Sequence, residues 1–448
     1  MNRRNFITNA AMLGAGMPVI TSAALTGCST GEKKQKLLTP EDVGMFSFAD
    51  KAPDGKPIRA ALIGCGSRGT GAAEQFIRSG AGCSIVAMAD LFPDRLNASH
   101  KHLKEKLGND VPENACFLGF DAYKKVLELP DIDAVLLCTP QHFRPEHFMA
   151  AVNAGKHAFV EKPCAVDPVG VRTVLAAGKI AKSKGLTVVA GTHLRHRRDY
   201  WEAYLQVRNG LIGDVICASA HSNQGAVWYK TQQPGWSDME YCIRNFFNIR
   251  WVSGDHFVDQ AIHFIDIATW FMDERPERAV GYGGRARCKS GDRFDFFTVD
   301  YYYADNRRMW TEARQIDGCD NNFSDQIYGS KGIVYMNYMH NDLKITDYNG
   351  NPLWEYAYAE KPIKSAYQQE HIHFTESIRT GKQINQAEML ANSTLIAIMG
   401  REAAYTGKAV TWDEIVASNL RLGPTTYEMG ALPDYHEGVV PVPGIAQG

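Results

Sequence analysis

The sequence predicts an α/β protein with two domains, an N-terminal one on a parallel sheet and a C-terminal α/β one on a large, mainly antiparallel open sheet. Between residues 58 and 190, short apolar runs without alternation are separated by helical patterns, which is typical of strands covered on both faces. After Gly191 longer strand-like runs dominate, such as 215–220 and 294–303, and these favour antiparallel pairing. The 448 residues, of which 45% are apolar, leave room for about two or three domains with sizeable cores.

The first predicted strand, residues 59–63, runs into Gly64-Cys65-Gly66-Ser67-Arg68-Gly69, and a helical pattern follows over 70–79. A G-x-G-x-x-G motif between a strand and a helix is the turn that holds the pyrophosphate of a dinucleotide. Gly64 permits the tight turn, Gly66 leaves space for the phosphates, and Gly69 lets the helix approach the strand. The motif therefore predicts a Rossmann domain over residues 58–190, with the phosphates at the N-terminus of its first helix.

Asp90 closes the second apolar run, residues 84–89, and follows Gly69 by 21 residues. A carboxylate at this place accepts hydrogen bonds from the adenosine ribose and repels a 2′-phosphate. We therefore expect NAD as the cofactor, with NADP less favoured.

Further buried strands are predicted at 134–138, 157–160 and 186–190, with a helix over 168–184. Thr139, Pro140 and His142 begin the loop after the first of these strands. Ligands bind in open α/β sheets at the carboxyl ends of the strands, so we expect these residues to lie beside the cofactor.

Two longer stretches carry a family resemblance. "CTPQHFRPEHFMAAVNAGKHAFVEKPCA" covers 138–165 and "GDHFVDQAIHFIDIATW" covers 254–270. Together with the glycine motif they resemble the Gfo/Idh/MocA oxidoreductases, and the resemblance extends from Ile58 to about Ile415. It implies an N-terminal Rossmann domain and a C-terminal α/β domain whose open sheet forms oligomer contacts, so we expect a dimer or tetramer. It also implies NAD(P)-linked chemistry at one hydroxyl of a sugar or cyclitol.

The resemblance assigns the catalytic roles. Lys162, in Glu161-Lys162-Pro163, is placed beside the nicotinamide and the reacting hydroxyl, and Asp259 and His263 match the acid and the histidine of the family. Because residues four apart share one helix face, we expect Asp259 to fix the tautomer of His263 and raise its basicity. A neutral His263 would take the hydroxyl proton while Lys162 stabilises the developing alkoxide. The alternative is that Asp259 and His263 form a buried structural pair.

The full set of expected cofactor contacts is Gly64, Gly66, Ser67, Arg68, Gly69, Asp90, Thr139, Pro140, His142, Glu161 and Lys162. The expected substrate contacts are His193, Arg195, Asn223, Tyr241, Arg250, Trp251 and His256. Tryptophan stacks on the C–H face of a sugar, and amide and guanidinium groups bind hydroxyls. His256 would share a helix face with Asp259 and His263, a donor set that also suits zinc or manganese. Since nicotinamide chemistry needs no metal, none is expected.

The N-terminus resembles an export address. Arg3 and Arg4 precede a small, moderately apolar stretch over 10–27, as in a twin-arginine signal, and Leu25-Thr26-Gly27-Cys28 resembles a lipoprotein cleavage box. We expect a signal over 1–28 that the twin-arginine export machinery reads, lipid anchoring at Cys28, a tether over 29–57, and a periplasmic or membrane-anchored protein.

The remaining boundaries follow from the change in pattern. Residues 191–385 are expected to form the substrate and oligomerisation domain, and 386–448 a C-terminal helix and tail that pack back on the body. The net charge of −2, without a basic patch, does not favour nucleic acid as a partner. The nine cysteines other than Cys28 form no C-x-x-C motif, which argues against a disulfide framework or a zinc ribbon.

Three functions remain open from the sequence. The first is an exported NAD-dependent oxidoreductase for a sugar or glycoside, with C3 as a candidate position and a tightly held cofactor, since fresh cofactor is lacking outside the cytoplasm. The second is a redox-neutral NAD-dependent glycosidase. That branch of the family resembles this chain in its export signal and glycine turn, but it lacks Glu-Lys-Pro and differs from the Asp259-x-x-x-His263 motif. The third is a non-catalytic protein that binds NAD or sugar.

Overall fold

The computed structural model describes residues 37–363 and 365–445, and the described residues from Leu38 onward form one compact unit. The first domain contains a six-stranded sheet in the order β3-β2-β1-β4-β5-β6, and all its strands are parallel. The strands are β1 (Ile58–Ile63), β2 (Cys83–Asp90), β3 (Cys116–Leu118), β4 (Ala134–Leu137), β5 (His157–Val160) and β6 (Val188–Ala190). The strand order reverses between β1 and β4, and ligands bind in open parallel sheets at such a point.

Helices connect these strands because every parallel pair needs a crossover. They are α1 (Ser67–Ile77), α2 (Pro93–Leu107), α3 (Ala122–Leu127), α4 (Arg144–Asn153) and α5 (Pro168–Ser183), with the 3₁₀ turns η1 (Glu113–Ala115) and η2 (Gln141–Phe143). Strands β4 and β6 are buried along their whole length, which explains their unbroken apolar sequences. Local signals set the helix ends: Asp167 caps α5 by accepting from the Gly170 amide, and Pro168 opens it.

The second domain is built on a nine-stranded sheet in the order β14-β13-β12-β11-β7-β10-β9-β8-β15. Its strands are β7 (Val215–Gln224), β8 (Arg278–Gly284), β9 (Phe296–Tyr302), β10 (Arg308–Gln315), β11 (Asn322–Gly329), β12 (Ile333–Asn337), β13 (Asp342–Thr346), β14 (Pro352–Glu355) and β15 (Val410–Thr411). Only β7 and β10 pair in parallel. The predicted fold class, α/β with a mainly antiparallel second sheet, is confirmed.

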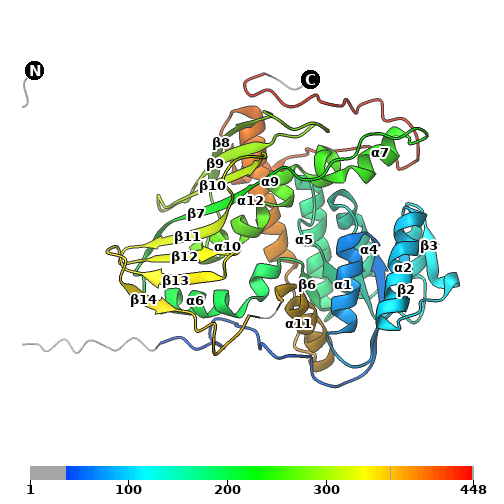
Figure 1. The fold of residues 1–448 in the computed structure, drawn as a ribbon, viewed down its shortest axis with the longest axis horizontal. Helices are drawn as coiled ribbons and strands as arrows, with labels where there is room; N and C mark the ends of the chain where they lie inside the picture. The colour runs from blue at the N-terminus through cyan, green and yellow to red at the C-terminus, as the bar shows by residue number, and fades with distance from the viewer. Residues whose placement is uncertain (1–36, 364, 446–448) are drawn as a thin grey trace, which may run out of the picture. The chain divides into compact units, whose positions relative to one another are not determined.

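One face of the large sheet carries its core. Along β10 buried and half-buried residues alternate, as expected where one side of a sheet is covered. The helices α10 (Ile262–Met272) and α12 (Ala387–Thr406) pack against its strands and against each other, and Figure 1 shows α12 in orange behind the green strands. The shorter elements of this half are η3 (His193–His196), α6 (Arg198–Arg208), α7 (Asp238–Arg244), η4 (Phe246–Asn248), α8 (Arg250–Ser253), α9 (His256–Asp259) and α13 (Trp412–Ala417).

The chain returns to the first domain before its last long helix. Helix α11 (Ala366–Thr380) packs against α1 and β6, and Asn385 forms a bridge with Val188 at the sheet edge. Residues 366–385, assigned from sequence to the second domain, therefore also contact the first. Helix α12 lies in the segment for which the sequence predicts a C-terminal helix, and it packs on both α5 and the large sheet.

Residues 38–57, expected to belong to a tether, pack along the body instead. The Leu38 amide donates to Asn209 Oδ1 at 2.7 Å, and the ring of Phe46 stacks on His196 with centroids 5.3 Å apart. Val43, Met45, Phe46 and Phe48 contact the main core. Their apolar surface outweighs the polar composition that suggested a free segment. The predicted signal, Cys28 and residues 29–36 lie outside the described residues.

Two further findings concern the described part of the chain. None of its helices is both long and apolar enough to span a membrane. Its nine cysteines are all free thiols.

Candidate active site

A cleft of about 1290 Å³ opens at the carboxyl ends of the first-domain strands and is lined by residues of both domains. The first domain contributes the glycine turn, Asp90, Thr139, Pro140 and the Glu161-Lys162 pair. The second contributes His193, Asp259 and His263. This volume exceeds the roughly 300–1000 Å³ of a site for one small ligand, so it suits a dinucleotide together with a substrate.

The glycine turn has the shape that a pyrophosphate requires. Gly64 has a φ of +97°, and a Cβ there would lie 2.6 Å from the backbone of Cys138. A Cβ on Gly69 would lie 1.8 Å from the Gly64 carbonyl oxygen, whereas one on Gly66 would meet nothing within 4 Å. Helix α1 starts directly after Gly66 without a side-chain cap, so its first N–H groups are free for an anion. The described residues therefore fit NAD.

Asp90 ends β2 at the wall of the cleft. One carboxylate oxygen accepts from the Cys65 amide at 2.6 Å and the other from the Phe92 amide at 2.8 Å. Burial raises the pKa of this carboxyl group. Asp90 thus holds the glycine turn against β2 while it lines the position predicted for the ribose.

Arg68 and Glu161 support the backbone at Lys162. The Arg68 guanidinium contacts Glu161 Oε1 at 2.5 Å and Glu370 Oε1 at 2.9 Å, and it lies 4.8 Å from the ring centre of Tyr367. The other oxygen of Glu161 accepts from the Lys162 amide at 3.0 Å. The predicted cofactor residues Arg68 and Glu161 therefore fix the backbone from which Lys162 projects.

Lys162 and Asp259 meet across the cleft. The ammonium group donates to the Asp259 backbone carbonyl at 2.5 Å and lies 3.7 Å from Oδ1 of the same residue. Gln141 donates its side-chain amide to that oxygen, and the second oxygen, Oδ2, has no partner. The second domain thereby places a carboxylate and a carbonyl directly on the lysine.

Asp259 and His263 do not share a continuous helix, contrary to the expectation from their spacing. Helix α9 ends at Asp259 and α10 begins at Ile262. Between them the Ala261 amide donates to His256, five residues back, so the turn is wider than an α-helical one. The expected hydrogen bond is not formed, since Nδ1 of His263 has no partner, although both residues line the cleft.

His193 and His263 form a neutral aromatic pair beside Lys162. Their ring centroids are 4.5 Å apart, edge to face, and His193 stacks on Tyr367 at 4.2 Å. Burial and then the nearby Lys162 charge lower the pKa of both rings well below the usual histidine range. Five buried polar atoms at this place have no partner: Gln141 Oε1, both nitrogens of His193, Asp259 Oδ2 and His263 Nδ1. Because buried polar groups are normally satisfied, these atoms suit a ligand rich in hydroxyls.

Two further predicted substrate residues face away from the cleft. Arg195 forms two hydrogen bonds to the carboxylate of Asp266, at 2.8 and 3.0 Å. Asn223 lies against Glu312, while its neighbours Ser222 and Gln224 line the cleft. Successive side chains of a strand point to opposite faces, which explains why β7 presents the residues on either side of Asn223.

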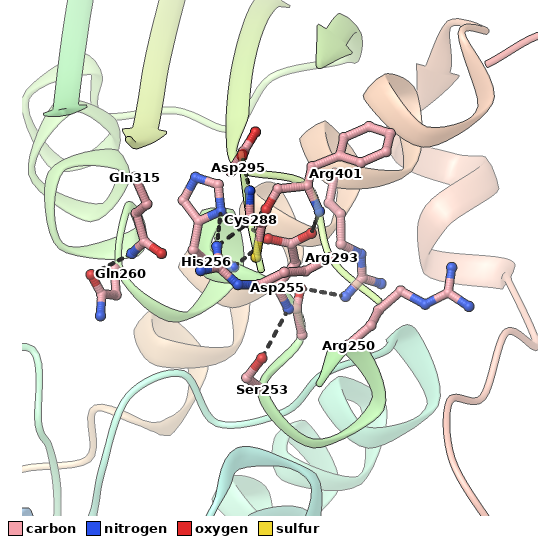
Figure 2. Close-up of polar contacts among 12 residues, drawn as sticks. Arg250, Ser253, Asp255, His256, Gln260, Cys288, Arg293, Asp295, Gln315 and Arg401 are labelled. Carbon is pink, nitrogen blue, oxygen red and sulfur yellow. Dashed lines mark hydrogen bonds and ion pairs between the residues drawn. The ribbon is translucent and has the colours of Figure 1, made fainter. Parts of the chain in front are cut away.

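Four others, and one predicted cofactor residue, do not line the cleft but contact other parts of the fold. Tyr241 bonds Ser290, Arg250 pairs with Asp292, and Trp251 packs edge to face on His142. His142 bonds the Tyr427 hydroxyl at 2.8 Å, so the C-terminal tail covers it. His256 contacts Asp255 and Arg293, as Figure 2 shows, and it does not line the cleft. Their polar and aromatic character suited a sugar site, but it is used inside the fold.

The sequence reasoning missed other residues that line the cleft. They are Gln141, Ser222, Gln224, Trp228, Phe247, Gln260, Tyr338 and Tyr367. Gln141 and Gln260 directly follow the predicted residues Pro140 and Asp259, and this position could have indicated that they line the cleft. Tyr367 reaches the cleft from α11, and nothing in the sequence around it indicated this.

No group of three or more His, Cys, Asp or Glu side chains among the described residues is arranged to hold a metal ion. The break between α9 and α10 separates His256 and Asp259 from His263, the three residues whose spacing suggested a metal site.

Fold and cleft together define an NAD-dependent oxidoreductase. The description "oxidoreductase family, NAD-binding Rossmann fold" matches residues 58–192, and "oxidoreductase family, C-terminal alpha/beta domain" matches 205–411. The chain belongs to this family, Gfo/Idh/MocA.

Three similar proteins illustrate the range of the family. A myo-inositol 2-dehydrogenase of Thermotoga maritima is 26% identical over 335 residues, which cover 72% of this chain and 89% of the relative. A glycosyl hydrolase family 109 protein of Shewanella pealeana is 26% identical over 221 residues, 49% of this chain and 45% of the relative. The crystal structure of scyllo-inositol dehydrogenase from Lactobacillus casei with bound NAD(H) and scyllo-inositol superposes with a TM-score of 0.60, at 22% identity, over 81% of this chain and all of that one.

Proposed function

We propose that this protein oxidises one hydroxyl of a sugar or glycoside with tightly held NAD, with the C3 hydroxyl as the candidate position. The observation that carries the proposal is the meeting of Lys162, a neutral His263 and five unpartnered polar atoms beside the glycine turn. The similarity to a myo-inositol dehydrogenase supports a polyhydroxylated ring as the substrate.

The roles of the residues follow from their charges. Bound NAD supplies the hydride acceptor, held by the glycine turn and Asp90. Neutral His263 removes the hydroxyl proton as the carbon is oxidised, and the Lys162 ammonium stabilises the oxygen as negative charge develops on it. Asp259 holds Lys162 in place, Gln141 holds Asp259, and both offer acceptors to neighbouring hydroxyls.

We propose that the export address is functional, and this favours a closed redox cycle in which one bound cofactor is reduced and re-oxidised. A twin-arginine substrate folds before export and would carry its cofactor with it. Outside the cytoplasm the same bound nicotinamide must be reset by a second carbonyl compound. We therefore expect ping-pong kinetics, in which one sugar is oxidised and another carbonyl is reduced.

A redox-neutral glycosidase is the second candidate, and the glycosyl hydrolase family 109 relatives favour it. In that reaction transient oxidation acidifies the neighbouring C–H, the aglycone leaves, water adds, and the hydride returns. The presence of Glu161-Lys162-Pro163 and of the Asp259-x-x-x-His263 motif favours the dehydrogenase.

A panel of glycosides incubated with the NAD-loaded protein separates these functions. A ketone product with reduced nicotinamide supports the dehydrogenase, and free aglycone without net reduction supports the glycosidase. Binding without either product would indicate a protein that only binds sugar, and this result would contradict the proposal.

A further inference from the structure

Four aromatic side chains line the cleft, and we call them the aromatic rim: Trp228, Tyr229, Phe246 and Phe247. Trp228 and Tyr229 are each 46% exposed. The ring of Trp228 lies 5.1 Å from that of Phe247, which lies 4.2 Å from Phe246. Large aromatic side chains that stay half exposed beside a reactive cleft mark a place where a ligand covers them.

The rim is held in place by buried side chains. The Trp228 carbonyl accepts from Asn248 Nδ2 at 3.2 Å, and the Lys230 amide donates to Asn245 Oδ1 at 2.8 Å. Both asparagines are fully buried, and Asn245 also donates to Ser290 at 2.7 Å. The loop after β7 is therefore ordered before any ligand binds, which lowers the entropic cost of binding.

The same network reaches the helix that carries Asp259. Arg293 donates to Asn248 Oδ1 at 3.1 Å and lies 3.3 Å from His256 Nδ1. His256 begins α9, and Asp259 ends it. Figure 2 shows His256, Asp255 and Arg293 gathered at this place. The rim and the reactive centre are thus fixed to one buried frame.

The loop that carries the rim directly follows β7, whose last residue lines the cleft. Gln224 lines the cleft at the end of β7 and its amide contacts Gln260, the neighbour of Asp259. Trp228 follows four residues later, so its Cα lies within about 14 Å of that of Gln224. The cavity is continuous between the two.

We propose that the aromatic rim is a second subsite, which takes the ring attached to the sugar that is oxidised. The substrate class is then a glycoside or oligosaccharide rather than a free monosaccharide or cyclitol, an inference that rests on the proposed function. A sugar ring presents an apolar C–H face that covers aromatic carbon, and its hydroxyl edge stays in water. Half-exposed rings that line a cleft suit such a partner, and Lys230 and Gln224 add polar groups to the same lining.

The test compares Trp228→Ala with Tyr282→Ala, which removes a 66% exposed aromatic ring from β8. The probes are glucose, galactose and N-acetylgalactosamine, each as the free sugar and as its p-nitrophenyl glycoside. Stacking on one aromatic ring changes affinity about two- to tenfold. We expect the ratio of kcat/KM for glycoside over free sugar to fall by that factor in Trp228→Ala, through KM, and to be unchanged in Tyr282→Ala.

Binding measured by calorimetry on the NAD-loaded protein separates the two levels of the proposal. Weaker glycoside binding in Trp228→Ala, in a protein that oxidises no sugar, would sustain the subsite and overturn the dehydrogenase. An unchanged glycoside-to-sugar ratio would overturn the subsite. Loss of bound NAD from Trp228→Ala on gel filtration would also overturn it, because the rim would then cover the cofactor.

Discussion

In the reaction we propose, His263 and Lys162 act from the same cleft with opposite tasks. The pKa of His263 lies well below its usual range because of burial and the Lys162 charge. The imidazole is therefore neutral at ordinary pH and free to accept a proton. The Lys162 ammonium group donates to the carbonyl of Asp259, and in the proposed reaction its positive charge stabilises the reacting oxygen.

Replacing either group should lower turnover while NAD stays bound. The loss of a general base costs about 10²–10⁴-fold, and we expect His263→Ala and Lys162→Ala each to fall in this range. The double variant should lose less than the product of the single losses, because both groups act on one transition state. Bound NAD measured after gel filtration, with the exposed His340→Ala as the control, separates catalytic loss from cofactor loss.

The dependence of the rate on pH provides a second test of His263 as the base. The proposed reaction requires neutral His263, so the activity should be lost as the pH falls through the lowered pKa of that ring. The acidic limb should therefore lie below 6.5, the ordinary histidine value. Unchanged single-turnover reduction in NAD-loaded His263→Ala would move the role to the adjacent His193.

Asp90 should set the choice of cofactor. Asp90→Ser removes the carboxylate that repels a 2′-phosphate, so the preference for NAD over NADP should narrow, as measured by fluorescence titration. The exposed Asp110→Ser of the same domain is the control. Equal affinity of the unmodified protein for both cofactors would refute the ribose assignment. Because Asp90 also holds the Cys65 amide, thermal unfolding of each variant must be recorded.

At the scale of elements, the large sheet contains an acid without a partner. Asp325 on β11 is fully buried and neither carboxylate oxygen has a hydrogen bond. Burial raises the pKa of Asp325 well above the ordinary value of 3.8, and the nearby Asp266 raises it further. The folded state thus binds a proton that the unfolded state releases.

The contribution of Asp325 to the free energy of unfolding should fall as the pH rises above about 3.8. Between the pKa of this group in the unfolded state and its raised pKa in the folded state, the unfolded state binds fewer protons than the folded state. Asp325→Asn removes this dependence. We expect it to raise the melting temperature at neutral pH, and to have less effect near pH 4, where the carboxyl group is protonated in the folded state and partly protonated in the unfolded state. Exposed Asp320→Asn is the control, and a pH-independent difference would contradict the explanation.

At the scale of the whole molecule, we propose that the protein is exported with its cofactor already bound. The change of Arg3 and Arg4 to lysine should leave the protein in the cytoplasm, since the twin-arginine receptor reads that pair. Cys28→Ala should give an exported protein without a lipid anchor. Fractionation of cells into cytoplasm, periplasm and membrane checks both, and a Cys28→Ala protein that stays on the membrane after a salt wash would refute the lipoprotein interpretation.

Local sequence alone was enough for the first domain and its turn. The glycine spacing, the acid at the end of β2 and the short apolar strands each depend on the geometry of adjacent residues. Their positions in the chain therefore predicted their positions in the fold. The same holds for Lys162, which lies two residues after the end of β5, although its role came from the family resemblance.

Only the tertiary structure decided which residues face the ligand. His142 is covered by Tyr427, which lies 285 residues away, and His256 and Tyr241 are taken up by the network behind the aromatic rim. The side chain of Asn223 points to the other face of β7 from its neighbours Ser222 and Gln224, which line the cleft. A widened turn separates Asp259 from His263. A residue type shows what a side chain can bind, but the burial and the distant partners that determine its contacts arise only when the chain packs.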